Sequence, residues 1–273
     1  MLNLNKIDID KIADDILYFI KGIEGLWYDY IKRIDPHEKK YIDILKKELK
    51  RHYQEVFDNI DKYPDNTDEW TFDRKYWEIH FAEIESKFIT ALIKQEGQRA
   101  FDYALNLARK DIEPSFDIYS PEVTNALIGQ TSRFSTQLVN TSENEIRTAI
   151  AAGLEQGESY DKLALRVQKL LGADAIKGRA ELIARTETVF ASASGAELGY
   201  LQSGVVEGKE WMTAEDERTC EFCMEMNGRT APLGESFDVN DINLNFDYSA
   251  GAMPHPPLHC KCRCVLLPII KGI

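Results

Sequence analysis

Metal-ligating side chains are concentrated in two short stretches towards the C-terminal end of the chain. Cys220 and Cys223 stand at the C-x-x-C spacing, and the stretch HCKCRC runs from His259 to Cys264. Two thiolates at that spacing can bind one zinc ion from a single turn of chain, and a second pair of donors completes a tetrahedron. All five cysteines lie in these two stretches. The pattern predicts a zinc site that joins them.

The second pair of donors is left open by spacing alone. His259 and Cys262 have the spacing of a second knuckle. If the segment is extended instead, its side chains alternate, and Cys262 with Cys264 becomes the competing pair. We take the two knuckle pairs as the predicted ligands, with Cys264 as the alternate ligand and Cys260 as a spare thiol. Four protein ligands leave no open position, which is typical of a structural zinc site, and reduced thiols without metal are the alternative.

Catalytic motifs built around metal or phosphate are missing from the sequence. It has no H-E-x-x-H, no H-x-E with P-C-x-x-C, no Walker loop and no G-x-G-x-x-G. His255 and His259 could act as bases beside the predicted metal, but a ligand or loop role suits them better. We therefore expect no enzymatic activity, and we assign no catalytic residue and no cofactor other than zinc.

Composition limits the classes of protein to which the chain can belong. Its 273 residues are 44% hydrophobic and 29% charged, which is enough for a substantial core in one large domain or two modest ones. Acidic residues in MLNLNKIDIDKIADD argue against a secretory signal, and no stretch approaches the roughly 20 apolar residues of a membrane span. We expect folding in a reducing cytoplasm, where clustered cysteines bind metal rather than form disulfides. The net charge of −13 argues against nucleic-acid binding by the whole surface.

Long helices are predicted in the first third of the chain. Apolar residues recur at three- and four-residue intervals over residues 12–34, and the stretch DPHE at 35–38 has the order of a capping box that starts a second helix. A third helical stretch covers about residues 72–108. Two prolines in residues 113–122 indicate a hinge after it.

Shorter helices are predicted between residues 121 and 200. Ser142 with Glu145 has the spacing of another capping box, and Gly157 closes the helix that this box would open. Ser159 then starts the next helix. These signals divide residues 121–200 into several short helices.

A long helix and a strand-containing segment complete the chain. The stretch from Gly178 to Val205 is rich in small residues, which predicts close packing against a neighbouring helix, and Glu181 with Arg185 has the spacing of a helical ion pair. Trp211 lies in a short stretch that we expect to be a half-buried strand, and the last apolar stretch predicts a closing strand. The predicted fold class is α+β, mainly α-helical with a small C-terminal β-containing cap stabilised by zinc. Its predicted regions are an N-terminal helical region (1–120), a helical core (121–204) and a cysteine-rich cap (205–273).

Several motifs together resemble the phage Mu F-like minor head protein family, also called phage head morphogenesis proteins. The stretches RAELIARTET, SGVVEGKEWMTAEDERTCEFCMEMNGRT and PPLHCKCRC follow the order of that family's motifs. The matching positions are Arg185, Thr186 and Glu187, then Lys209 and Trp211, then Asp216, Arg218, Cys220 and Cys223, then Pro256, Pro257, His259, Cys262, Arg263 and Cys264. The resemblance covers about residues 140–268. Cys260 and Lys261 stand where the family usually has a pair without cysteine, which leaves the ligand set open.

The resemblance implies a minor head protein of a tailed bacteriophage. Such a protein would be associated with the portal protein, and with scaffold or major capsid protein as further partners, and would act in head morphogenesis, DNA packaging or DNA ejection. It would reside in the virion, in the head interior or at the portal vertex, after assembly in the host cytoplasm. The N-terminal helices would contact the portal or scaffold, contact with packaged DNA would be local, and no membrane would be involved.

A phage-encoded enzyme is the alternative that the resemblance leaves open. Domains of this family resemble the leading modules of some fused phage toxins, including ADP-ribosyltransferases, and a metal-dependent nuclease is a further candidate. Arg185 and Glu187 would be the residues to test for transferase activity.

Overall fold

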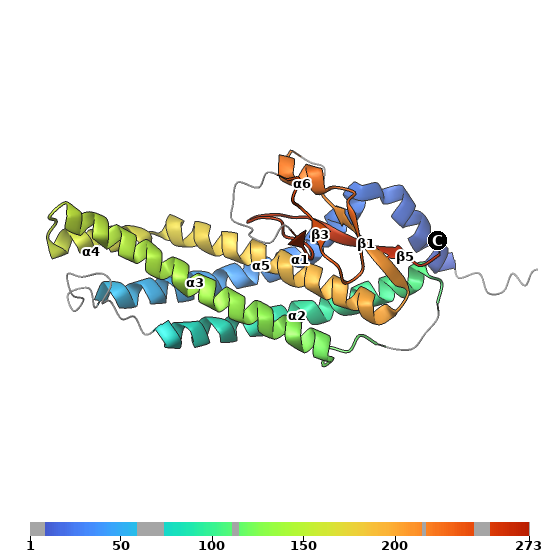
Figure 1. Ribbon diagram of the computed structural model, residues 1–273, viewed down its shortest axis with the longest axis horizontal. Helices are drawn as coiled ribbons and strands as arrows, with labels where there is room; N and C mark the ends of the chain where they lie inside the picture. The colour runs from blue at the N-terminus through green and yellow to red at the C-terminus, as the bar shows by residue number, and fades with distance from the viewer. Residues whose placement is uncertain (1–8, 59–73, 111–114, 215–216, 243–251, 273) are drawn as a thin grey trace, which may run out of the picture.

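The protein consists of an elongated helical body with a small β cap beside one end (Figure 1). The computed structural model describes residues 9–58, 74–110, 115–214, 217–242 and 252–272. The helices are α1 (Ile9–Asp58), α2 (Arg74–Leu107), α3 (Pro121–Glu155), α4 (Tyr160–Leu170), α5 (Ala173–Ser203) and α6 (Glu221–Met226). The strands are β1 (Val206–Met212), β2 (Thr230–Pro232), β3 (Phe237–Asp238), β4 (Ala252–Met253) and β5 (Val265–Ile270). The predicted fold class, a helical protein with a C-terminal β cap, is confirmed.

The predicted break in the first helix is wrong, because α1 continues through Pro36. A proline inside a helix has no backbone N–H to donate to the fourth preceding carbonyl, so the local sequence favoured a boundary. Glu38, which the capping-box pattern assigned to a helix start, is buried. Its carboxylate accepts hydrogen bonds from Nε and Nη2 of Arg185 on α5, at 3.1 and 2.9 Å. Glu38 therefore pairs with an arginine of another helix instead of capping the start of its own. The apolar side chains at residues 12–23 lie outside the described residues.

The predicted start of a helix at Ser142 is also wrong, since α3 runs without interruption from Pro121 to Glu155. The Ser142 hydroxyl donates to the Leu138 carbonyl at 2.9 Å within the helix. Glu145 points away from the helix backbone and forms an ion pair with Arg179 on α5. The true N-terminus of α3 is capped by Ser120, followed by Pro121.

The predicted boundary between α3 and α4 is confirmed. Gly157 follows the end of α3 with a φ of +65°, a backbone conformation that glycine adopts without strain. Ser159 is the N-cap position of α4. The hinge predicted at residues 113–122 stays a prediction, because residues 113 and 114 lie outside the described residues.

Close packing of small residues on α5 is confirmed by its contact with α2. A Cβ atom built at Gly199 would lie 2.2 Å from the carbonyl oxygen of Gly97, and one at Gly195 would lie 3.0 Å from the carbonyl oxygen of Ile93. The two helices therefore meet backbone to backbone. The predicted pairing of Glu181 with Arg185 is wrong, because Glu181 lies 3.8 Å from Lys177 while Arg185 binds α1.

The cap is built on a three-stranded antiparallel sheet in the order β2-β1-β5. Trp211, predicted to be half buried, is completely buried in the central strand, where its ring contacts the edge of Phe237 at 5.4 Å between centroids. Lys209 on the same strand is also fully buried. Its ammonium group donates to the carboxylate of Glu197 on α5 and to the carbonyl of Pro254 at 2.6 Å. These contacts fix the sheet on the helical body.

The hydrophobic core is continuous between the helical body and the cap. One cluster contains Leu92 and Phe101 of α2, Tyr200 of α5 and Trp211 of β1. A second cluster lies among the helices further from the cap, and a third joins Tyr30 of α1 to cap residues including Met212 and Val265. The division into three separate regions stays a prediction. Within the described residues, no helix is both long and apolar enough to span a membrane.

Candidate metal centre

The first cysteine pair is presented by the start of α6. Cys220 is the N-cap residue of this short helix, and its Sγ accepts a hydrogen bond from the backbone N–H of Cys223 at 3.5 Å. The turn after α6 is tied to the end of β1. Gly228 N donates to the Trp211 carbonyl at 2.8 Å, and Thr213 N donates to Asn227 Oδ1 at 2.9 Å. The central strand of the sheet therefore holds the C-x-x-C turn in place.

The second stretch forms a tight turn before β5. The backbone N–H of Cys262 donates to the His259 carbonyl at 3.1 Å, and Lys261 has a φ of +65°. Of the two conformations that the sequence left open for residues 259–262, the structure has the turn. β5 begins at Val265, directly after Cys264.

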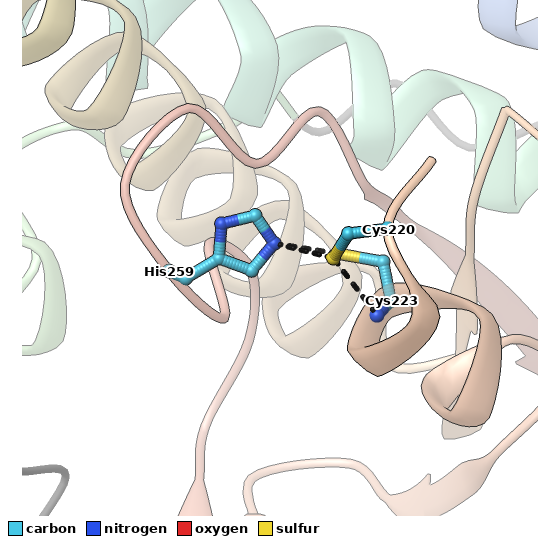
Figure 2. A group of neighbouring side chains, drawn as sticks. All are labelled: Cys220, Cys223 and His259. Atoms are coloured by element: carbon cyan, nitrogen blue, oxygen red, sulfur yellow. Dashed lines mark hydrogen bonds between the residues drawn. The ribbon is translucent and has the colours of Figure 1, made fainter. Parts of the chain in front are cut away.

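The two turns bring five donor atoms together. His259 Nε2 lies 3.0 Å from Cys220 Sγ and 3.1 Å from Cys223 Sγ, and Figure 2 shows the ring pointing at the first cysteine pair. Cys223 Sγ lies 3.8 Å from Cys262 Sγ. The donor atoms of Cys223, Cys262 and Cys264 form a second group within 4.8 Å of one another, so Cys223 belongs to both groups. Cys260 is exposed and belongs to neither.

The donors fit a thiophilic metal ion such as zinc. His259 Nδ1 lies 2.7 Å from the Cys260 carbonyl oxygen, to which it can only donate, so the Nε2 lone pair is directed at the cysteines. Two thiolates bound to one zinc ion at about 2.3 Å lie about 3.8 Å apart in a tetrahedron, which is the Sγ–Sγ distance between Cys223 and Cys262. Hydrogen bonding with Cys262 and Cys264, followed by burial, raises the pKa of the Cys223 thiol. Thiolates this close repel one another unless a cation lies among them.

The ion would act as a cross-link between the two turns. Cys220, Cys223, His259 and Cys262 would hold it, or Cys264 in place of one of them, and either set fills a tetrahedron without an open position. Zinc as the ion, and the choice among the five donors, stay predictions.

The residues considered for catalysis do not form a common site. His255 is buried, accepts from the Ser194 hydroxyl at Nε2 (3.0 Å) and donates from Nδ1 to the Pro256 carbonyl (2.6 Å). Burial lowers the pKa of His255, so both ring nitrogens serve structural hydrogen bonds of a neutral ring. Glu187 is buried and accepts from Arg133 at 3.0 Å, whereas Arg185 binds Glu38. Arg185 and Glu187, the two residues considered for transferase activity, therefore belong to two separate ion pairs.

Sequence reasoning missed the contribution of α1 to this centre. Trp27 Nε1 donates to the carbonyl of Arg263, between two of the cysteines, at 3.1 Å. The guanidinium of Arg218 lies over the Trp27 ring, 5.5 Å from its centroid. No local signal could have shown this contact, because 236 positions separate Trp27 from Arg263.

Comparison with known proteins agrees with the resemblance in the motifs. Residues 144–267 match the family described as Phage Mu protein F like protein. The minor head protein GP7 of Bacillus phage SPP1 is 33% identical over 131 residues, which are 47% of this chain and 41% of that protein, so less than half of the relative's length is matched. No solved structure matches the chain. The segment that is similar to the Phage Mu protein F like family contains both cysteine turns.

Proposed function

We propose that this protein is a minor head protein of a tailed bacteriophage, associated with the portal and acting in head morphogenesis and in the packaging or ejection of DNA. The observation that carries the proposal is the family match over residues 144–267, which contains the complete cysteine and histidine cluster. The name of the SPP1 relative, a minor head protein, supports the same assignment. Its place would be the virion, at the head interior or the portal vertex, after assembly in the host cytoplasm.

The proposed metal site has a mechanical role in this function. The cap consists of a three-stranded and a two-stranded sheet that share their core with the helical body, and a closed zinc site would add folding free energy to this unit. The cross-link would join the α6 turn to the β5 turn, and Trp27 would extend it to α1. A head protein that must keep its shape in the virion would be stabilised by these two connections.

The helical body is the proposed contact surface for the portal, and for scaffold or major capsid protein as further partners. Tyr76 and Ile79 near the start of α2 are 46% and 53% exposed, and Ile128 of α3 is 60% exposed. Large apolar side chains at the surface are the anchors that protein partners bury. The acidic net charge of −13 would limit general adhesion to packaged DNA.

The head assignment is tested in the phage that encodes the chain. An amber mutation in the gene should yield defective heads or poorly infectious particles by electron microscopy and plaque assay, and complementation by the full chain should restore them. Mass spectrometry of purified virions should detect the protein in few copies, and tagged full chain should co-purify with the portal protein. Virions that lack the protein and remain fully infectious would refute the head role.

The zinc site is tested separately on the purified full chain. Elemental analysis should find one zinc per chain, and a strong chelator should lower the melting temperature. Cys223→Ser should lose the metal, because Cys223 belongs to both groups of donors. Cys260→Ser is the matched control and should keep it, because this thiol is exposed and outside both groups. Absence of metal from the unmodified chain, with the same melting temperature in chelator, would reject the zinc site and leave the family assignment intact.

A further inference from the structure

A layer of polar side chains crosses the interior of the helical body. The four long helices α1, α2, α3 and α5, which run alongside one another in Figure 1, all contribute to it. Its members are Tyr41 of α1, Glu85 of α2, Gln130 and Arg133 of α3, and Glu187 of α5. Tyr41 belongs to the second hydrophobic cluster, so this layer lies within the core. We refer to these five side chains as the polar layer.

The polar layer contains two buried carboxyl groups and one cation. Glu85 is completely buried, and Glu187 is 5% exposed. Arg133 Nη2 lies 3.0 and 3.4 Å from the two carboxylate oxygens of Glu187, and Gln130 Nε2 donates to the same carboxylate at 3.2 Å. The arginine therefore pairs with Glu187. Within the described residues, Glu85 has no ion-pair partner.

The two oxygens of Glu85 have little around them to stabilise a negative charge. Oε2 accepts a hydrogen bond from the Tyr41 hydroxyl, and Oε1 is buried without a hydrogen-bond partner among the described residues. Burying an ionised carboxylate without a cation or enough donors costs so much free energy that the group takes up a proton instead. This environment therefore favours a neutral carboxyl group at Glu85.

The neighbouring Glu187 gives a second reason for Glu85 to be neutral. Two carboxylates that share a site disfavour one another's charge. Burial, followed by the charge of Glu187, raises the pKa of Glu85, while the Tyr41 hydroxyl and the charge of Arg133 oppose this. These three residues are the titratable and charged groups that face Glu85 from α5, α1 and α3. Burial also raises the pKa of Glu187, but Arg133 and Gln130 donate to its carboxylate and hold the charge there.

We propose that Glu85 is a neutral carboxylic acid in the folded protein and acts as a pH-sensitive lock between α1 and α2. In the neutral form it accepts the hydrogen bond of the Tyr41 hydroxyl across the interface between these helices. Release of its proton to solvent would leave two negative charges beside one arginine in the core. Water would then be drawn towards the polar layer, and the contact between α1 and α2 would weaken. The helical body would therefore loosen as the pH rises.

Infrared spectroscopy of the full chain tests for the neutral acid directly. A protonated carboxyl group has a carbonyl band that a carboxylate lacks. At pH 7 this band should be present in the unmodified chain, lost in Glu85→Gln and kept in Glu96→Gln. Glu96 is the matched control, because it lies on the same helix and is 1% exposed. Burial opposes its ionisation, but hydrogen bonds from Arg33 and the charge of Arg99 lower its pKa, so it is already ionised.

Urea unfolding between about pH 5 and pH 8 measures the same proton through stability. A glutamate of the unfolded chain has a pKa of about 4.3, so unfolding above pH 5 would release the proton that folded Glu85 holds, and stability falls as the pH rises. For each pH unit, the unfolding equilibrium constant of the unmodified chain should rise up to about tenfold more than that of Glu85→Gln. Glu96→Gln should be less stable at every pH but should keep the pH dependence of the unmodified chain.

The outcomes decide the proposal in full. Glutamine has the shape and neutrality of the protonated acid, so a Glu85→Gln protein that fails to fold, or is destabilised as much as Glu96→Gln, would overturn it. A carbonyl band that is absent from the unmodified chain, or persists in Glu85→Gln, would do the same. Stability that differs between sodium and potassium salts at constant ionic strength, with the difference lost in Glu85→Gln, would show that a metal cation neutralises the polar layer in place of a proton. Since the purified chain alone is tested, failure here would leave the proposed head role standing.

Discussion

Substituting Gly199 by alanine should destabilise the protein, whereas the same change at Gly178 in the same helix should stabilise it. At Gly199 the new Cβ would lie 2.2 Å from the Gly97 carbonyl oxygen and 3.0 Å from both Ala100 Cβ and Phe101 N. Cβ atoms are essentially never closer than 3.0 Å to such neighbours, so α5 and α2 would have to move apart by about 0.8 Å. The nearest obstructing atom belongs to the backbone of Gly97, so it cannot move aside by a change of side-chain rotamer. Gly178 is exposed, and nothing lies within 4 Å of a Cβ built there.

The two free energies can be worked out from these contacts. Overpacking costs about 1–3 kcal/mol, and separation of two closely packed helices belongs at the upper end of that range. Alanine in a helix interior regains about 1 kcal/mol relative to glycine at either site. The free energy of unfolding should therefore fall by about 2 kcal/mol for Gly199→Ala and rise by about 1 kcal/mol for Gly178→Ala. The loss of about 2 kcal/mol expected for Gly199→Ala corresponds to a drop in melting temperature of about 4–8 °C.

Urea unfolding followed by circular dichroism, with calorimetric melting temperatures as a second measure, would compare both variants with the unmodified chain. The difference between the variants, about 3 kcal/mol, is the quantity that tests the packing. A Gly199→Ala protein as stable as Gly178→Ala would show that the backbones of α2 and α5 do not meet at this point, and would refute the reasoning.

Two further substitutions test buried polar groups. Burial lowers the pKa of His52 from 6.5 to about 3, so below pH 6.5 the unfolded chain takes up a proton that the folded chain does not, and stability falls as the pH drops. The loss is about 4 kcal/mol at pH 3, of which about 3 kcal/mol is reached by pH 4. His52→Phe should remove this loss while leaving stability at pH 7 unchanged or higher, since His52 Nδ1 is buried without a hydrogen-bond partner among the described residues. Urea unfolding at pH 7 and pH 4 measures both, and equal losses in the two proteins would contradict the assignment. Lys209→Met should lower the free energy of unfolding by about 3 kcal/mol, because it leaves the partly buried Glu197 without its ion-pair partner. Combining it with Glu197→Gln should recover part of the loss, and strictly additive effects in a double-mutant cycle would show that the two groups do not interact.

Local chemistry explains the features that could be predicted from the sequence. Gly157 follows the end of one helix because glycine adopts the left-handed conformation without strain, and Ser159 occupies the N-cap position of the next, where serine is a preferred residue. The small residues of α5 predicted a close helix contact, and the C-x-x-C spacing predicted a metal-binding turn, because both patterns depend on residues less than two turns apart. The similarity to the Phage Mu F-like family could be inferred for the same reason, since the motifs of that family are short and ordered along the chain.

Tertiary structure decided what short-range signals could not. The sequence around Glu38 and Glu145 has the pattern of a helix start, yet both glutamates form ion pairs with arginines of α5 inside uninterrupted helices. An N-cap contributes only about 1 kcal/mol, so the apolar burial along a longer packed helix outweighs it. The same limit applies to the candidate sites. The cysteines could be grouped by spacing, but the contact of Trp27 with the Arg263 carbonyl depends on packing between segments far apart in the chain, where sequence distance carries no information about proximity.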